Sequence, residues 1–282
     1  MWKQKLGISI GNKFPIPMTD VVELLHKIGF DAISPLWAPE AELPAIVQTA
    51  RECGMTVQSL HAPFEGAADM WSRDEAVSKP ALDQLLQSLE AGKQLQIPIL
   101  VVHTWIGFEY HYDPDTLYFQ NYESLVSKAE ECGIQIAFEN TEGEEFLFAL
   151  MEHFKDRKSV GFCWDYGHEI CYNHSQDLLA VLGDRLLVTH LNDNLGISRF
   201  DGSTFWTDDL HLLPYDGVAD WDWNIERLKQ ARKLDILNFE LTTRSKPERH
   251  ENDLYAQMSL ELYFTEVYKR ACKIGYRYAN IE

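Results

Sequence analysis

The chain has 282 residues, of which 45% are hydrophobic and 12% aromatic. This composition is typical of a folded globular protein and excludes a disordered chain. The 44 acidic and 25 basic residues give a formal net charge of −19. A charge of this sign repels phosphate backbones and anionic membrane surfaces, so we expect neither a nucleic-acid nor a membrane partner.

The cysteines and the start of the chain bear on where the protein resides. The five cysteines are odd in number, and no two of them form a C-x-x-C motif, which suits a reducing compartment. The segment from Met1 to Lys5 lacks the apolar region of a signal peptide. No apolar run reaches the roughly 18 residues that a membrane helix needs. We therefore expect a cytoplasmic protein without a membrane span.

Short apolar runs alternate with amphipathic segments along the whole chain. Most of the runs have the length of a strand and are rich in Val, Ile and Leu, as expected for parallel strands that are buried on both faces. Eight such strands are predicted: Leu6–Ile10, Ala32–Leu36, Thr56–Leu60, Ile97–His103, Ile134–Glu139, Val160–Asp165, Leu186–His190 and Ile236–Leu241.

The segments between these strands have helical periodicity. Asp20 is the expected N-cap of the first helix, whose apolar side chains recur on one face. Gly29, Gly54 and Gly133 each stand between a helix and the next strand, where we expect left-handed C-caps. The later helices are predicted at Ala41–Cys53, Ala81–Gln94, Asp115–Cys132, Glu144–Phe154, Gln176–Leu182, Trp223–Leu234 and Leu254–Ile274.

Eight strands alternating with helices predict an α/β fold, a single (β/α)8 TIM barrel that spans residues 1–282 as one domain. A doubly wound open sheet is the competing fold. It normally carries a glycine-rich phosphate turn after the first strand. The residues Ile10-Gly11-Asn12-Lys13 do not form that turn, which favours the barrel.

In six of the eight predicted strands, a histidine or an acidic residue stands at the last position or one residue to either side of it. In a barrel these ends meet at one mouth, where catalytic groups lie. Burying so many ionisable groups together is costly unless they are paired or bind a metal. A mixture of imidazole and carboxylate ligands suits Mn²⁺, Zn²⁺, Co²⁺ or Fe²⁺. The six residues are His61, His103, Glu139, Asp165, His190 and Glu240.

Further polar residues follow the sixth and seventh strands. His168 stands three residues beyond Asp165, and Asp193 stands three beyond His190. A long loop then carries Asp209 and His211. Long loops on the catalytic face commonly form lids or binding elements, so we expect these residues near the same mouth.

Together these motifs resemble the xylose-isomerase-like TIM-barrel superfamily from about residue 5 to about residue 270. That superfamily includes sugar and sugar-phosphate isomerases and epimerases, inosose dehydratases and isomerases, and endonuclease-IV-type enzymes. The motifs that carry the resemblance are His61-Ala62-Pro63-Phe64, Glu139-Asn140-Thr141, Asp165-x-Gly167-His168, His190-x-Asn192-Asp193, Asp209-x-His211 and Glu240-Leu241-Thr242.

The resemblance to the epimerases and ketose isomerases implies one divalent metal, held by Glu139, Asp165, His190 and Glu240. The two glutamates would also be the catalytic acid/base groups on opposite faces of the substrate, because epimerisation needs a proton donor and acceptor on two faces. The metal would stabilise an enediolate. His168 and Arg199 would bind substrate oxygens. This predicts an isomerase or epimerase of a sugar, keto-sugar or inositol derivative.

Two alternatives remain open within the same resemblance. A metal-dependent dehydratase of an inosose-like substrate begins with the same proton removal. An endonuclease-IV-type phosphodiesterase holds three zinc ions on nine ligands. A residue of the required type stands at each of the nine positions here: His61, His103, Glu139, Asp165, His168, His190, Asp209, His211 and Glu240.

The loops that follow the strands favour a small polyol or keto-sugar over DNA. Trp105–Glu109 and Thr141–Glu145 are aromatic and acidic, whereas a nuclease mouth should be basic. We expect one metal ion per chain, and the ligand set leaves room for up to three. His61, His103, His168, Asp193, Arg199, Asp209 and His211 are expected to bind substrate or additional metal. Arg199, Arg244 and Lys246 are candidates for binding an anionic group, and the sequence leaves a homo-oligomer open.

Overall fold

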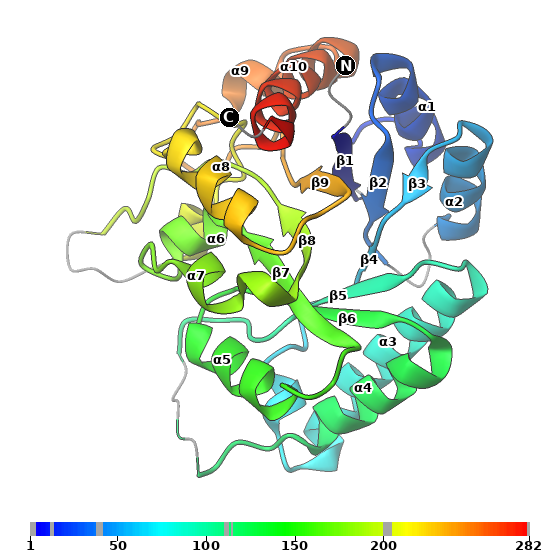
Figure 1. Cartoon of the computed structure of the whole chain (residues 1–282), viewed down its shortest axis with the longest axis vertical. Coiled ribbons are helices and arrows are strands. Elements are labelled where there is room, and N and C mark those ends of the chain that lie inside the picture. Colours follow the sequence, from blue (N-terminus) through cyan, green and yellow to red (C-terminus); the bar gives the residue numbers. More distant parts are fainter. Residues whose placement is uncertain are drawn as a thin grey trace.

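Parallel strands form a ring at the centre of the molecule, and helices surround it (Figure 1). The computed structural model describes residues 4–11, 14–37, 42–109, 113, 115–199 and 205–280. One arc of the ring has the order β3-β2-β1-β9, and the other has the order β4-β5-β6-β7-β8. The strands are β1 (Lys5–Ile10), β2 (Ala32–Pro35), β3 (Thr56–Val57), β4 (Leu60–His61), β5 (Ile99–His103), β6 (Gln135–Glu139), β7 (Val160–Asp165), β8 (Leu186–His190) and β9 (Ile236–Phe239).

Two parallel bridges join the arcs into a closed barrel. Leu36, just beyond β2, pairs with His61 of β4, and Leu191, just beyond β8, pairs with Phe239 of β9. The backbone N–H of Trp37 donates to the carbonyl of His61 at 2.8 Å. Among the described residues, the closed ring leaves no free sheet edge, and the predicted (β/α)8 barrel is confirmed.

The third predicted strand, Thr56–Leu60, is wrong as a single element. The chain forms two short strands here, because β3 pairs with β2 while β4 pairs with β5. Between them the hydroxyl of Ser59 donates to the hydroxyl of Ser34 at 2.9 Å, and both residues are buried. The other seven strands agree with the prediction to within two residues at each end.

The helices cover the outside of the barrel. They are α1 (Met18–Ile28), α2 (Leu43–Glu52), α3 (Glu75–Gln94), α4 (Gln120–Cys132), α5 (Glu144–His153), α6 (Tyr166–Cys171), α7 (Leu178–Leu182), α8 (Trp221–Gln230), α9 (Asp253–Ala256) and α10 (Leu260–Ala279). Three 3₁₀ turns accompany them: η1 (Asp69–Trp71), η2 (Gly183–Arg185) and η3 (Trp206–Asp208). Among the described residues, no helix is both long and apolar enough to cross a membrane.

Several helix boundaries differ from the sequence-based expectation. Helix α1 begins two residues before Asp20, after Pro17, so the expected Asp20 cap is wrong. Helix α3 begins at Glu75 because Asp74 caps it, and it continues through Pro80. The last predicted helix, Leu254–Ile274, is divided into α9 and α10, since the Ser259 side chain accepts from Leu262 N and starts a new helix. Ala41, in the predicted second helix, lies outside the described residues.

Two of the three expected glycine caps show why glycine is needed. Gly133 ends α4 in the left-handed conformation, with φ 71° and ψ 26°. Gly29 follows α1 with φ 123°, and a side chain there would begin 2.8 Å from the hydroxyl of Tyr268. Gly54 also has a positive φ, of 77°. A larger residue would strain the backbone at each of these turns.

Strand alternation separates the barrel interior from the layer under the helices. Val101, Ala137, Cys163 and Val188 belong to a small buried cluster, separate from the larger apolar core. Successive side chains along a strand point to opposite faces. The residue two positions after each of these four therefore points to the same face, but nearer the end of the strand. Those residues are His103, Glu139, Asp165 and His190.

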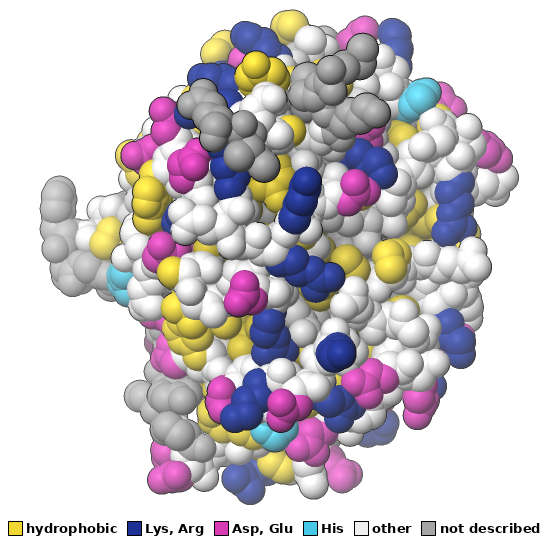
Figure 2. Space-filling view, in the orientation of Figure 1, with side chains coloured by type: hydrophobic (Ala, Val, Ile, Leu, Met, Phe, Trp, Pro, Cys, Tyr) yellow, Lys and Arg dark blue, Asp and Glu magenta, His cyan; other side chains and the backbone are white. Residues whose placement is uncertain are grey.

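Charged side chains of both signs are interspersed over the face that Figure 2 views. Many cations are paired locally, as Lys79 is with Asp83 at 3.0 Å and Lys269 with Glu266 at 3.1 Å. Exposed pairs of this kind contribute at most about 1 kcal/mol to stability.

Candidate metal centre

The buried carboxylate of Glu139, at the end of β6, lies at the centre of the site. Its Oε1 lies 3.0 Å from Nδ1 of His190 and 3.6 Å from Nδ1 of His168. Its Oε2 lies 3.3 Å from Nε2 of His61 and 3.5 Å from Nε2 of His103. One carboxylate thus meets four imidazoles that come from four different strand ends or loops.

Glu240 completes the group that the sequence predicts. Its Oε2 lies 3.0 Å from Nδ1 of His190, the same nitrogen that faces Glu139. One ligand atom from each of Glu139, Asp165, His190 and Glu240 lies within 4.8 Å of the others. Whereas Glu139 is fully buried, the Glu240 side chain is 24% exposed. These four residues are the predicted metal ligands, and the fold brings all of them together.

Two further groups flank this one. His61 and His103 share Glu139 with it, and His168, Asp209 and His211 form a separate group in which the ligand atoms also lie within 4.8 Å. Asp209 Oδ1 lies 3.0 Å from Nε2 of His211 and 3.5 Å from Nε2 of His168. His211 has a φ of 47°, in the left-handed region that non-glycine residues seldom adopt.

Charge and burial act against each other on these groups. Burial alone would raise the pKa of Glu139, but the charge of His190 and the hydrogen bond from its ring hold that pKa well below its usual range. Burial lowers the pKa of His103 to about 3. Glu139 is therefore ionised and His103 neutral at neutral pH, which are the forms that bind a cation.

The donors fit a divalent metal. Oε2 of Glu139, Oδ1 of Asp209 and Nδ1 of His103 are buried and have no hydrogen-bond partner in the part of the chain that the structure describes. Buried polar atoms are rarely left unsatisfied, and the carboxylate oxygens would gain a partner from a cation. Imidazole with carboxylate is the ligand chemistry of Zn²⁺, Mn²⁺, Co²⁺ and Fe²⁺.

A second layer of amides holds Asp165 in place. Nδ2 of Asn192 donates to both carboxylate oxygens of Asp165, and the backbone N–H of His168 donates to Oδ1 at 2.8 Å. Asn140 accepts from the backbone N–H of Asp165 and donates to the backbone carbonyl of the same residue. Asp165 is thus also the N-cap of α6, a short helix that the sequence pattern did not reveal.

Two of the predicted site residues are in none of these ligand groups. Asp193 is fully buried, and its carboxylate accepts from the N–H groups of Asn194, Tyr215 and Ala219 and from the indole of Trp221. It therefore holds the loop between β8 and α8. Arg199 is exposed on that loop, with its guanidinium 4.6 Å from the centre of the Phe205 ring.

A cavity of about 410 Å³ opens above the candidate ligands. Phe64, Phe108, Tyr172 and Trp206 contribute aromatic side chains to its wall. Glu142 also borders it, mostly buried, where its Oε1 accepts from Gly107 N at 2.9 Å; burial raises the pKa of this carboxyl. The strand-end rule does not reach Tyr172 or Trp206, because Tyr172 follows α6 and Trp206 lies in η3. Carbon–hydrogen surfaces of a sugar pack well against such walls.

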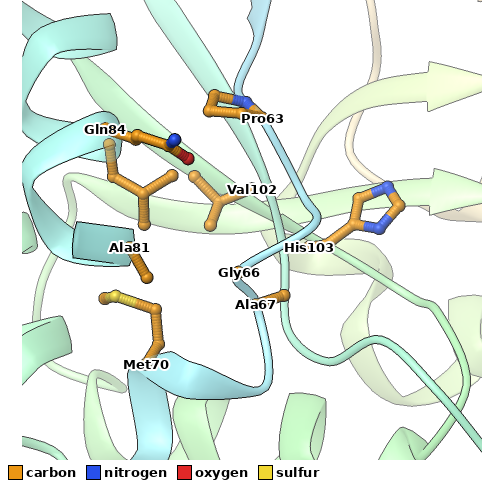
Figure 3. Close-up of a pocket in the computed structure, with 9 residues that line it drawn as sticks. Pro63, Gly66, Ala67, Met70, Ala81, Gln84, Val102 and His103 are labelled. Atoms are coloured by element: carbon orange, nitrogen blue, oxygen red, sulfur yellow. The ribbon is translucent and has the colours of Figure 1, made fainter. Parts of the chain in front are cut away.

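A smaller apolar cavity lies behind the site. It holds about 10 Å³, room for at most one water molecule. Val102 points toward Met70 and Ala81 across it, whereas the ring of the next residue, His103, points away (Figure 3). This cavity therefore belongs to the packing of β5, not to the binding of ligand.

Sequence and structure comparisons agree with this architecture. The family model described as xylose isomerase-like TIM barrel matches residues 22–262. The chain therefore belongs to the xylose isomerase-like TIM-barrel family.

The individual relatives share little sequence identity with this chain. The protein y4fM of Sinorhizobium fredii is 26% identical over 258 residues, which cover 78% of this chain and 79% of y4fM. The structure of the IolI protein with a bound zinc atom is similar with a TM-score of 0.73 and 18% identity, over 96% of this chain and 98% of IolI. The structure of an L-ribulose 3-epimerase is similar with a TM-score of 0.71 and 12% identity, and the match covers 98% of this chain and 95% of the epimerase. At these identities the two structures show a shared fold.

Proposed function

We propose that this protein is a divalent-metal-dependent isomerase or epimerase of a sugar, keto-sugar or inositol derivative. The observation that carries the proposal is that two glutamates contact the same imidazole nitrogen. Glu139 and Glu240 each lie 3.0 Å from Nδ1 of His190, and Glu240 borders the cavity. The shared fold with an L-ribulose 3-epimerase and with zinc-bound IolI supports this class.

Glu139, Asp165, His190 and Glu240 would hold the metal, which when bound supplies a Lewis acid for the substrate oxygens. Glu240 is the ligand with a side chain partly open to the cavity, so it is placed to take a proton from the carbon beside a carbonyl. Glu139 lies on the floor of the site and would return the proton from the opposite face. The aromatic walls exclude water and orient the carbon chain.

A second candidate function has one observation in its favour. The three ligand groups together contain all nine residues that the resemblance assigns to a three-zinc site. Such a site suits phosphodiester cleavage of the endonuclease IV type. The chain's net charge of −19 argues against a DNA substrate.

Metal analysis and isotope exchange separate the candidates. We expect about one metal per chain, and deuterium from D₂O in a ketose or inosose at the carbon beside the carbonyl. Release of water with an enol or diketone product would instead indicate the dehydratase. Three metals per chain with nicking of abasic DNA would overturn the proposal in favour of the nuclease.

Variants test the two glutamates. Glu240→Gln keeps an oxygen ligand, so it should retain metal yet lose exchange by about 10²-fold or more, the usual contribution of a general base. Glu139→Gln should also abolish turnover. Full exchange in either variant with metal bound would refute its acid/base role.

A further inference from the structure

Two cations border the mouth of the cavity in a chain that is otherwise strongly acidic. Arg244 and Lys246 both lie on the loop that follows β9, and both line the cavity that Glu240 borders from below. Since the net charge of the chain is −19, these two side chains bring positive charge to a cavity that Glu142, Asp209 and Glu240 also line.

Hydrogen bonds within the loop hold its backbone in place. The side chain of Asn252 donates to the carbonyl of Arg244 at 3.1 Å, and the backbone N–H of Asn252 donates to the hydroxyl of Ser245 at 2.9 Å. The backbone N–H of Lys246 donates to Oε1 of Glu251 at 2.7 Å. The two cations are therefore presented by a preorganised segment, which reduces the entropy lost when they bind a ligand.

Among the residues that the structure describes, the ammonium group of Lys246 has one long contact to an acid. Its Nζ lies 3.5 Å from Oδ2 of Asp209, an aspartate that already faces His211 at 3.0 Å and His168 at 3.5 Å. Its side chain is 22% exposed, and its Nζ lies 5.4 Å from the ring centre of Trp206. Elsewhere the pair Lys155–Glu152 closes to 2.6 Å. Lys246 thus retains capacity for a stronger anionic partner.

We propose, resting on the proposed function, that the substrate carries an anionic group, a carboxylate or a phosphate, at the end remote from its reacting carbons. The guanidinium of Arg244 and the ammonium of Lys246 bind that group at the mouth. The opposite end of the substrate then reaches Glu240 and the candidate ligands at the floor. Charge-assisted hydrogen bonds of this kind fix orientation as well as affinity.

Binding to metal-free protein tests the anion site separately from catalysis. The probes are D-glucose, D-glucuronate and D-glucose 6-phosphate, measured by calorimetry on the full chain after treatment with EDTA. We expect at least tenfold tighter binding of one anionic probe than of glucose. The uronate and the phosphate are separate arms, so the preferred probe identifies the group. Equal binding of all three probes would overturn the inference.

Variants then assign the preference to the two side chains. Lys246→Gln and Arg244→Gln should each weaken the preferred anionic probe by at least tenfold and leave glucose unchanged, while Lys246→Arg should retain the preference. Lys269→Gln, which removes a helix-surface lysine paired with Glu266, is the matched control and should change nothing. Unfolding midpoints must stay equal among the variants. Loss of the preference in the control too, or in neither variant, would contradict the assignment.

Turnover distinguishes the two proposals. If neutral ketoses react and Lys246→Gln leaves their KM and that of their phosphates unchanged, the anion site fails and the proposed function stands. If the anionic preference holds in binding but no ketose or inosose exchanges deuterium, the proposed function fails and the anion site stands.

Discussion

Asn192 donates from its side-chain amide to both carboxylate oxygens of Asp165, at 3.1 and 3.0 Å. Both residues are fully buried. An aspartate that is held at both oxygens cannot rotate freely, so Asn192 fixes the direction from which Asp165 faces a metal. Asn192 is thus a positioning residue for the candidate centre.

Removal of this amide should weaken metal binding without unfolding the chain. We expect Asn192→Ala to lower zinc affinity by about 10- to 100-fold, the usual effect of losing a group that orients a ligand. Competition with a zinc chelator measures it. Asn121→Ala, which removes a side-chain hydrogen bond to the carbonyl of Met70 on the flank of the barrel, is the control and should bind zinc normally. Equal affinity in both variants would show that Asn192 orients nothing.

Gly167 is a second test of the same contact. A Cβ at this position would lie 1.8 Å from Oδ1 of Asn192. Exchanging glycine for alanine within a helix normally stabilises a protein by roughly 0.5–1 kcal/mol. Because the methyl group would displace Asn192, we expect Gly167→Ala to have the opposite sign and to lower both the free energy of unfolding and zinc affinity. Denaturant unfolding with zinc titration measures both, and a stabilised variant with full affinity would contradict this.

The barrel and most of its candidate ligands could be predicted because strand ends follow simple rules. His103, Glu139, Asp165 and His190 lie at the ends of parallel strands, and the barrel brings such ends together. Asp193 shows the limit of this rule, since a polar residue after a strand can face either way. Alternation carries Asn192 inward with His190 and turns Asp193 toward the following loop.

Loop residues could not be placed from local patterns. Tyr172 and Trp206 reach the cavity from segments whose paths depend on tertiary contacts, and helix α6 is too short for a periodic signal. The third strand was predicted as one element because its break depends on a change of partner strand, which the local sequence does not encode.

The four hydrogen bonds to Asp193 make it a structural residue by our interpretation. Asp193→Ala would leave four N–H donors without their acceptor, and each buried donor left unsatisfied costs about 1–3 kcal/mol. We therefore expect a loss of about 3 kcal/mol or more in the free energy of unfolding, with the metal content of the folded fraction retained. Urea unfolding and metal analysis measure the two. Loss of metal with unchanged stability would instead place Asp193 among the ligands.

Metal removal should lower the thermal stability of the protein. An ion that binds only the folded chain stabilises it by about 4 kcal/mol when its free concentration is a thousandfold above Kd. For chains somewhat shorter than this one, each kcal/mol corresponds to about 2–4 °C. We expect EDTA to lower the unfolding midpoint by several degrees and added Zn²⁺ or Mn²⁺ to restore it. A variant that combines His190→Ala with Glu240→Ala should not respond, and a full response in that variant would place the metal elsewhere.

Arg227 of α8 forms a buried ion pair that the catalytic proposal does not use. Its Nη2 lies 2.7 Å from Oε1 of Glu169, and both side chains are almost fully buried. Burial raises the pKa of Glu169, and hydrogen bonding and charge from Arg227 oppose that rise. Removing one partner leaves the other charge uncompensated, so Arg227→Met should cost about 3–5 kcal/mol.

Changing both partners should restore much of that loss. The double variant Arg227→Met with Glu169→Gln removes both charges. It also keeps a hydrogen-bond acceptor for the indole N–H of Trp164, which donates to Oε2 of Glu169 at 2.8 Å. We expect the double variant to be more stable than Arg227→Met alone, because no unpaired charge remains buried. A double-mutant cycle in urea measures the coupling. If the two losses simply add, the ion pair does not act as a unit, and Arg227 stabilises α8 instead through its stacking on Trp223, whose ring centre lies 3.8 Å away.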